Sequence, residues 1–176
     1  FRRVLFRSKQ MRHILEYQDG VSFFGTSTNW EEKVEMGEGR SFGLEMMVQK
    51  TLGKTTGWLA YTLAKTDHRF KDGAISQGKW FPYKYDRRHT ISLCLNHKFS
   101  ERIDVGASWI FNTGGCITVP ERETIIIRPE GNIESAPYIS RRNNYRLPAS
   151  HRLNLGINFN KKTKHGMRTW NISLYN

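Results

Sequence analysis

The stretch GKWFPYKYDRRHTISLCLNHKF, residues 78–99, decides the fold class, because its second half alternates without interruption. From residue 89 onward, one side of the alternation consists of His89, Ile91, Leu93, Leu95, His97 and Phe99. The other side consists of Thr90, Ser92, Cys94, Asn96 and Lys98. Side chains on a β-strand point to opposite faces with a period of two. The stretch therefore predicts a strand with one apolar face and one polar face.

The length of this strand favours a bilayer over a soluble core. Residues 89–99 span about 33 Å when extended. At a tilt of about 40°, that length covers the apolar band of an outer-membrane barrel, which is about 25 Å tall. Strands in soluble domains are usually about 5–6 residues long. We therefore expect a transmembrane strand here.

Six further segments show the same alternation, some of them weakly. They cover residues 11–17, 40–52, 55–65, 103–112, 150–160 and 167–176. The connections between the seven predicted strands alternate between long and short. The long connections are residues 18–39, 66–87 and 113–149, and short turns join the strands between them. Long outer loops and short periplasmic turns are typical of bacterial outer-membrane barrels, and no segment has the spacing of an amphipathic helix. The sequence thus predicts an all-β fold, an antiparallel transmembrane β-barrel fragment. Within the last long connection, the run at 125–127 predicts a short extension or a hairpin.

The two ends of the sequence indicate a piece of a longer protein. Residues 1–8 (FRRVLFRS) do not join the alternation. We interpret them as a non-native leader, resembling adapter read-through, and assign residues 9–176 to the partial barrel. The chain begins with Phe rather than Met and stops inside an alternating run.

The net charge and the cysteine content limit the classes of function that the sequence allows. The formal net charge is +12, which is compatible with nucleic acid binding. The basic residues are spread along the chain, however, so we interpret them as part of loops, turns and a polar lumen and expect no nucleic acid partner. Cys94 and Cys116 do not make a disulfide framework, and no Cys/His spacing resembles a zinc site. We expect no metal and no cofactor.

The sequence contains no catalytic constellation. It has no His-Glu-x-x-His, Gly-x-Ser-x-Gly or P-loop motif, so we do not expect an enzyme. The cluster at residues 86–89 is interpreted as structural, with Asp86 pairing with an arginine. Aromatic residues near strand ends fit the girdles that flank the apolar band of a barrel; they are Phe99, Trp109, Phe111, Phe159 and Trp170.

Ligand contacts are expected from the outer loops and the upper lumen. The candidates are aromatic and basic residues, which suit anionic or sugar ligands through stacking and cation–π contacts. They are Trp30, Arg69, Lys71, Lys79, Trp80, Arg141 and Arg142. For each residue taken singly, an ordinary solvated loop position is the competing interpretation.

Three stretches resemble the C-terminal barrel region of TonB-dependent receptors, especially those of the Bacteroidota. They are GRSFGLEMMVQKTLGKTTGWLAYTLAKT (39–66), GKWFPYKYDRRHTISL (78–93) and YRLPASHRLNLGINF (145–159). The resemblance covers residues 9–176, and its most specific part is 79–89. Structural roles in the family motif are assigned on this basis to Trp80, Phe81, Pro82, Tyr83, Tyr85, Asp86, Arg87, Arg88 and His89.

The resemblance implies a 22-stranded barrel in the lipid bilayer of the bacterial outer membrane, with an N-terminal plug. Such a receptor imports a scarce ligand (an iron chelate, cobalamin, an oligosaccharide or a peptide) with energy delivered through TonB. Some members carry a surface lipoprotein lid. This sequence shows about seven of the strands and neither plug nor TonB box. An open sheet leaves backbone groups that lipid cannot satisfy, so we expect that this piece neither transports nor inserts stably alone.

Two other functional classes stay open at this point. A passive outer-membrane porin or structural barrel would show the same strand pattern without an upstream plug. A soluble, basic, β-rich nucleic-acid-binding protein would show salt-dependent affinity without any need for detergent.

Overall fold

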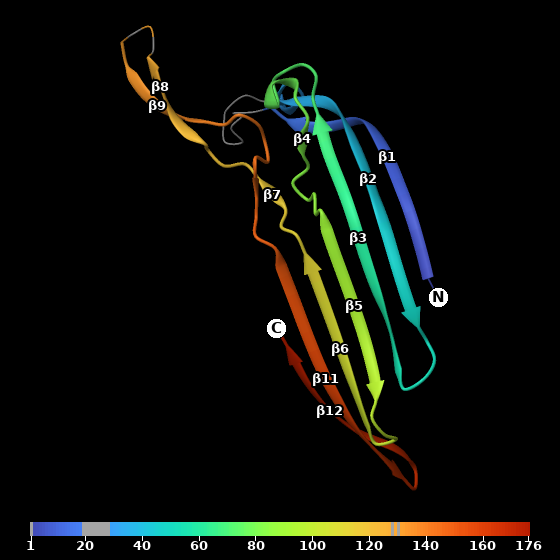
Figure 1. The fold of residues 1–176 in the computed structure, drawn as a ribbon. Helices are drawn as coiled ribbons and strands as arrows, with labels where there is room; N and C mark the ends of the chain where they lie inside the picture. Colours follow the sequence, from blue (N-terminus) through green and yellow to red (C-terminus); the bar gives the residue numbers. More distant parts are fainter. Residues whose placement is uncertain (1, 19–28, 128, 130) are drawn as a thin grey trace.

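One antiparallel sheet dominates the computed structural model, which describes residues 2–18, 29–127, 129 and 131–176. In this part of the chain, seven long strands pair in the order β1-β2-β3-β5-β6-β11-β12 (Figure 1). Their bounds are β1 Arg2–Tyr17, β2 Val34–Lys50, β3 Thr55–Arg69, β5 His89–Lys98, β6 Ile103–Asn112, β11 Ser150–Thr163 and β12 Gly166–Tyr175. The all-β, antiparallel prediction is confirmed at this level.

The long connections carry the shorter elements. These are the 3₁₀ helices η1 (Trp30–Lys33) and η2 (Ser76–Gly78), and the short strands β4 (Phe81–Pro82), β7 (Cys116–Ile117), β8 (Arg122–Ile127), β9 (Ile133–Tyr138) and β10 (Tyr145–Arg146). β4 pairs with β3, β10 with β7, and β8 with β9. The hairpin alternative at 125–127 is therefore confirmed, and the β8–β9 hairpin extends away from the main sheet (Figure 1).

Cross-strand pairing gathers apolar side chains on one face of the sheet. Val48 pairs with Leu59, Leu59 with Leu93, Leu93 with Trp109, and Trp109 with Leu153. Val48, Leu59 and Leu153 remain 49%, 44% and 41% exposed. Within the described residues, no second layer of structure covers this row. The apolar face of the sheet is thus open over five neighbouring strands.

The opposite face carries polar side chains that bond to one another across strands. The Asn154 amide donates to Ser108 Oγ at 3.2 Å. Asp104 accepts from the amides of Asn158 and Asn160, both at 2.7 Å. Opposite polar pairs of this kind stabilise neighbouring strands. The two faces therefore differ as the alternation in the sequence predicts.

The buried apolar cluster lies at the end of the sheet that carries the long connections. Among the described residues it consists of Phe70, Ile75 and Phe81, with Ile14 packed against it. Phe70 and Phe81 stack with ring centroids 6.1 Å apart. Packing of the long connections, rather than a layered core, therefore orders this end of the molecule.

The first strand begins earlier than the sequence predicts. Residues 2–8, which the sequence predicts to be a leader outside the sheet, form the first half of β1. Arg2 pairs with Val48 and Ser8 with Phe42. Val4 and Phe6 extend the apolar face, and the arginines around them hide that alternation in the sequence. Whether these residues are native to the protein stays a hypothesis.

Two predicted connections are also shorter than expected. β2 begins at Val34 rather than at residue 40, and β3 continues to Arg69 rather than ending at Lys65. The pair Glu38–Arg69 shows that the extra residues of the two strands pair with each other. Residues 19–28 of the first connection lie outside the described residues.

Among the described residues, none of the helices is long and apolar enough to cross a membrane.

Candidate functional site

Asp86 is the centre of the polar contacts at the long-connection end of the sheet. It lies between β4 and β5 and is 2% exposed. Its Oδ1 atom accepts the backbone N–H of Thr66 at 2.6 Å, and its Oδ2 atom accepts Arg88 Nε at 2.9 Å. A buried carboxylate is stable when it is both paired with a cation and hydrogen-bonded. Asp86 meets both conditions, as the predicted pairing with an arginine requires.

A second arginine joins this cluster from β10. Arg146 Nη2 donates to Asp86 Oδ2 at 2.5 Å. Arg146 Nη1 donates to the carbonyl oxygens of Asp86, at 2.5 Å, and Gly114, at 2.8 Å. The two most distinctive sequence motifs, around residues 79–89 and 145–153, therefore meet at one ion pair. Structural roles are predicted from the sequence for residues of the first motif, and none is predicted for Arg146.

The backbone at Gly114 and Gly115 permits this close approach. Cys116 N donates to Lys84 O at 2.8 Å, and Leu147 N donates to Gly115 O at 2.9 Å. A Cβ atom at Gly114 would lie 2.0 Å from Leu147 O, and one at Gly115 would lie 2.7 Å from Lys84 O. Only glycine lets three chain segments pack at these distances.

Cys116 lies beside the Asp86–Arg146 pair and is 4% exposed. Burial raises the pKa of the Cys116 thiol, and the nearby Arg146 guanidinium opposes part of that rise. Both cysteines are free thiols, with Cys94 partly exposed on β5. A buried thiol with a raised pKa is a poor nucleophile, so the local chemistry of Cys116 is that of a packing residue.

The aromatic residues of the 79–89 motif pack against β3. Tyr83 stacks on His68 with ring centroids 4.5 Å apart, and the Tyr85 ring lies edge-on to Tyr83 at 5.4 Å. Pro82 O accepts the side-chain amide of Asn143 at 2.8 Å. These contacts fix the chain before it enters β5.

The two remaining motif positions differ in their surroundings. Arg87 is exposed. His89 begins β5, and its Nδ1 atom lies 2.8 Å from Tyr61 Oη. The His89 N–H donates to Thr113 Oγ1 at 3.0 Å. His89 therefore ties β3 and the connection after β6 to the start of β5.

Of the predicted ligand contacts, the structure brings Trp80 and Arg69 together. Arg40 Cζ lies 4.2 Å from the centroid of the Trp80 ring, and Arg69 Cζ lies 5.9 Å from it. Arg69 is the last residue of β3 rather than a loop residue, and its Nε donates to Gly78 O at 3.0 Å. Arg40 was not among the predicted residues, because its place in a strand gave no sign of the contact.

Asp67 neutralises part of this basic cluster. It is 4% exposed, and its Oδ2 atom lies 3.1 Å from Arg40 Nη2 and 3.2 Å from Lys65 Nζ. In β2 and β3, Arg40 pairs with Asp67 and Phe42 with Lys65. The pairing places these charges at the same sheet face as Phe42. The cluster of Arg40, Arg69 and Trp80 therefore lies on the same side of the sheet as the apolar face, at the end that carries the long connections. The sequence predicts ligand contacts in the outer loops and the upper lumen instead.

The other predicted contacts are spread over the long connections. Lys71 Nζ lies 3.4 Å from Glu38 Oε1, and Lys79 Nζ lies 3.3 Å from Gln77 Oε1. Arg142 Nη1 lies 3.4 Å from Glu16 Oε1, the Arg142 guanidinium also donates to Tyr17 O, and the Arg142 backbone N–H donates to Ser76 Oγ at 2.9 Å. Trp30 lies in η1 and is 57% exposed, and Arg141 is exposed before β10. The seven candidates therefore do not form one site.

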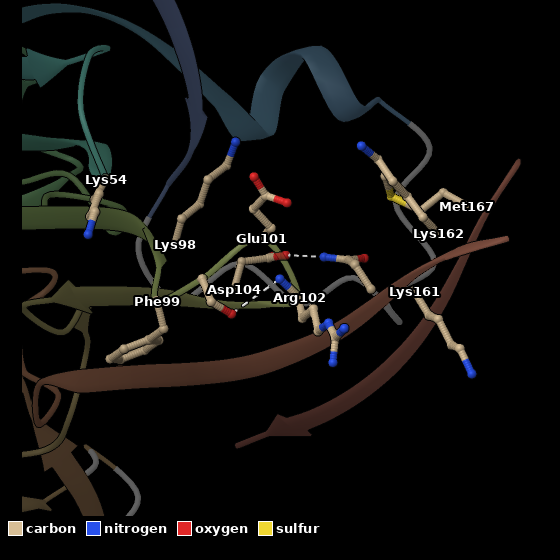
Figure 2. A pocket seen from close by; sticks show the side chains of 11 residues that line it. Lys54, Lys98, Phe99, Glu101, Arg102, Asp104, Lys161, Lys162 and Met167 are labelled. Atoms are coloured by element: carbon tan, nitrogen blue, oxygen red, sulfur yellow. Dashed lines mark hydrogen bonds between the residues drawn. The ribbon is translucent and has the colours of Figure 1, made fainter.

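A cavity of about 1160 Å³ lies at the opposite end of the sheet, among the short turns. It is lined by Lys54, Lys98, Phe99, Ser100, Glu101, Arg102, Asp104, Asn160, Lys161, Lys162 and Met167. Figure 2 shows Lys98 and Lys162 pointing to one side of the turns, and Arg102 and Lys161 to the other. The sequence shows the basic residues of the short turns but gives no sign that residues from different turns line one cavity.

Within the described part of the chain, no group of three His, Cys, Asp or Glu side chains lies close enough to hold a metal ion.

No family model, curated protein or solved structure matches the chain in comparisons with known proteins.

Proposed function

We propose that this chain is part of an outer-membrane TonB-dependent receptor, which actively imports a scarce ligand such as an iron chelate, cobalamin, an oligosaccharide or a peptide. The observation that supports this proposal is the two-faced meander. In the described part of the chain, seven long strands pair with their neighbours, present one open apolar face, and are joined by alternately long and short connections.

The apolar face has the chemistry that a lipid-facing barrel wall requires. β5 and β6 are each 10 residues long, which corresponds to about 33 Å of strand. Lipid-facing residues alternate with lumen-facing residues in outer-membrane strands. The row from Val48 to Leu153 would face lipid in such a wall, and the hydrogen-bonded amides around Asp104 would face the lumen.

The two edges of the sheet support the view that the chain belongs to a larger barrel. β1 and β12 end the strand order, so each presents an edge without a partner strand among the described residues. Backbone groups in lipid must be bonded within the protein. A closed barrel meets this need by adding further strands, and outer-membrane transporters have about 22 of them.

The DNA on either side of the coding segment gives the most direct test. We expect the upstream sequence to encode a plug domain followed by further alternating strands, and the downstream sequence to encode a closing strand that ends in an aromatic residue. A start codon near residue 1 and a stop codon directly after residue 176 would contradict the proposal.

Active import is separated from passive diffusion by a second experiment. Uptake of the ligand through the full-length protein is expected to stop in cells that lack TonB and to return when TonB is restored. A porin would conduct equally well in both strains, because diffusion through an open pore needs no energy. Equal uptake in the two strains would therefore overturn the proposed mechanism in favour of the porin alternative.

A further inference from the structure

We propose that a groove on the apolar face, beside the short turns, binds the phosphate of an anionic glycerophospholipid whose acyl chains lie along β11 and β12. This inference rests on the proposed function, because it requires a bilayer around the sheet. It concerns the opposite end of the molecule from the predicted ligand contacts.

The groove combines an apolar floor with a cationic rim. Its volume is about 410 Å³, and it is lined by Arg102, Ile103, Phe159, Asn160, Lys161, Arg168 and Trp170. Phe159 pairs with Trp170 and Lys161 with Arg168 across β11 and β12. The rings and the cations therefore occupy successive rows of one sheet face. Three of the seven lining residues are cations and none is acidic.

The cations of the groove are not neutralised, and one of them lies over an aromatic ring. Arg168 Cζ lies 5.0 Å from the centroid of the Trp170 ring. In the described part of the chain, Arg102, Lys161 and Arg168 form none of the observed ion pairs. Arg102 and Lys161 also line the neighbouring 1160 Å³ cavity, whose lining includes Glu101 and Asp104, but neither acid is in one of the observed ion pairs. An anion therefore meets uncompensated positive charge in the groove on the apolar face.

An anionic phospholipid fits this arrangement better than a soluble anion. The next rows of the face are Ile157–Ile172 and Leu155–Leu174, and Ile172 and Leu174 are 64% and 66% exposed. Acyl chains would cover these rows while the phosphate meets the rim. Guanidinium groups bind phosphate oxygens in a forked geometry, and basic residues beside a membrane attract anionic headgroups. A choline headgroup would bring its own cation close to the three cations of the rim.

The chain offers a matched pair of variants for the test. Lys161→Gln with Arg168→Gln removes two charges from the groove. Lys98→Gln with Lys162→Gln removes two charges from the other side of the same turns, where these side chains point away from Lys161 (Figure 2). The two double variants have the same net charge, so a difference between them reports position rather than overall charge.

The experiment is a titration of the full-length protein that contains this chain, in zwitterionic detergent micelles, with short-chain phosphatidylglycerol. The indole N–H resonance of Trp170, assigned through its loss in Trp170→Phe, reports binding in the groove. We expect phosphatidylglycerol to shift this resonance, and the groove variant to bind about tenfold more weakly than the matched control. Short-chain phosphatidylcholine and inorganic phosphate are expected to leave the resonance in place.

Each other outcome overturns a defined part of the proposal. Equal affinity of the two double variants would show that net charge alone attracts the lipid. An equal response to inorganic phosphate would show an anion site without lipid selectivity. A full-length protein that is β-structured in micelles but shows no response to phosphatidylglycerol would overturn the lipid site and leave the proposed function standing. A full-length protein that folds in buffer and not in micelles would overturn both.

Discussion

Asp86 and Arg146 lie 60 residues apart in the sequence, yet Arg146 Nη2 donates to Asp86 Oδ2 at 2.5 Å. The carboxylate side chain is 1% exposed, and the Arg146 side chain is 30% exposed. The pair fastens the segment before β5 to the segment before β11. These two segments come from different long connections, so the pair fixes how the connections pack on each other.

Removal of the buried carboxylate is expected to destabilise the fold strongly. Asp86→Ala removes the carboxylate that accepts from Arg88 Nε and Arg146 Nη2 and leaves the Thr66 N–H without its acceptor. This loss should lower the free energy of unfolding by about 3–5 kcal/mol. Urea unfolding in zwitterionic micelles measures the change. Asp72→Ala, at an exposed position, is the control and should change little. Equal effects of the two substitutions would contradict the central role of Asp86.

Addition of a single methyl group at Gly114 should disturb the same junction. The new Cβ would lie 2.0 Å from Leu147 O, so the chain segments must move apart at a cost of about 1–3 kcal/mol. Gly106→Ala is the matched control, because the nearest atom to its added Cβ would be Leu95 O at 4.0 Å. Urea unfolding should separate the two variants, and a neutral Gly114→Ala would show that the approach is looser than described.

The two cysteines should differ in reactivity. Burial raises the pKa of Cys116, which lowers its thiolate fraction and shields it from reagent. We expect iodoacetamide to alkylate Cys116, isolated in Cys94→Ser, at least about tenfold more slowly than Cys94, isolated in Cys116→Ser. Both should react alike in urea. Fast labelling of Cys116 in the folded chain would indicate that the junction opens.

Glu121 should titrate below its ordinary range. Hydrogen bonds from the Ser140 hydroxyl and the Asn144 amide hold the pKa of Glu121 down. A lowered pKa means that these bonds contribute stability above the ordinary pKa and lose it as the pH falls through the lowered one. Carboxyl NMR should show the pKa of Glu121 rising in Ser140→Ala. Ser135→Ala, whose hydroxyl donates to Glu123 instead, should leave the Glu121 titration unchanged.

The chain alone should not form a closed barrel. β1 and β12 are the two ends of the strand order in the described sheet, and lipid cannot satisfy their free edges. On unheated SDS gels we expect the chain to migrate as it does after boiling, while a complete outer-membrane barrel run alongside migrates faster before boiling. A detergent-resistant compact band would show that seven strands close by themselves or by self-association.

The alternation in the sequence was sufficient to predict the long strands. In β5 and β6 each side chain lies either on the apolar face or on the polar face of the sheet, so the sequence alternates with a period of two. The same reasoning failed in β1, where arginines surround Val4 and Phe6 and mask the apolar side. The predicted end of β3 at Lys65 was also too early, because Asp67 and His68 are polar residues of the kind typical of loops. In the structure both residues lie in β3 and are buried.

The contacts among the long connections could not be predicted in this way. Periodicity carries no information about which of two distant loops will pack together. The pairing of Asp86 with Arg146 depends on the path of 60 intervening residues. The contact of Arg40 with the Trp80 ring depends on how the connection after β3 packs against β2. Such contacts follow from three-dimensional packing, and only the residue types involved were visible beforehand.

The β8–β9 hairpin lies in the sequence between β6 and β11, two strands that are neighbours in the sheet. β6 precedes the hairpin and β11 follows it, and these strands pair from Ser150–Asn112 to Phe159–Ile103. Their register is therefore set by the strands themselves, not by the covalent link through the hairpin. The sheet passes directly from β6 to β11, although residues 113–149 separate the two strands in the sequence. A change in the length or sequence of the hairpin is therefore expected to leave the alignment of β6 and β11 in the sheet unchanged.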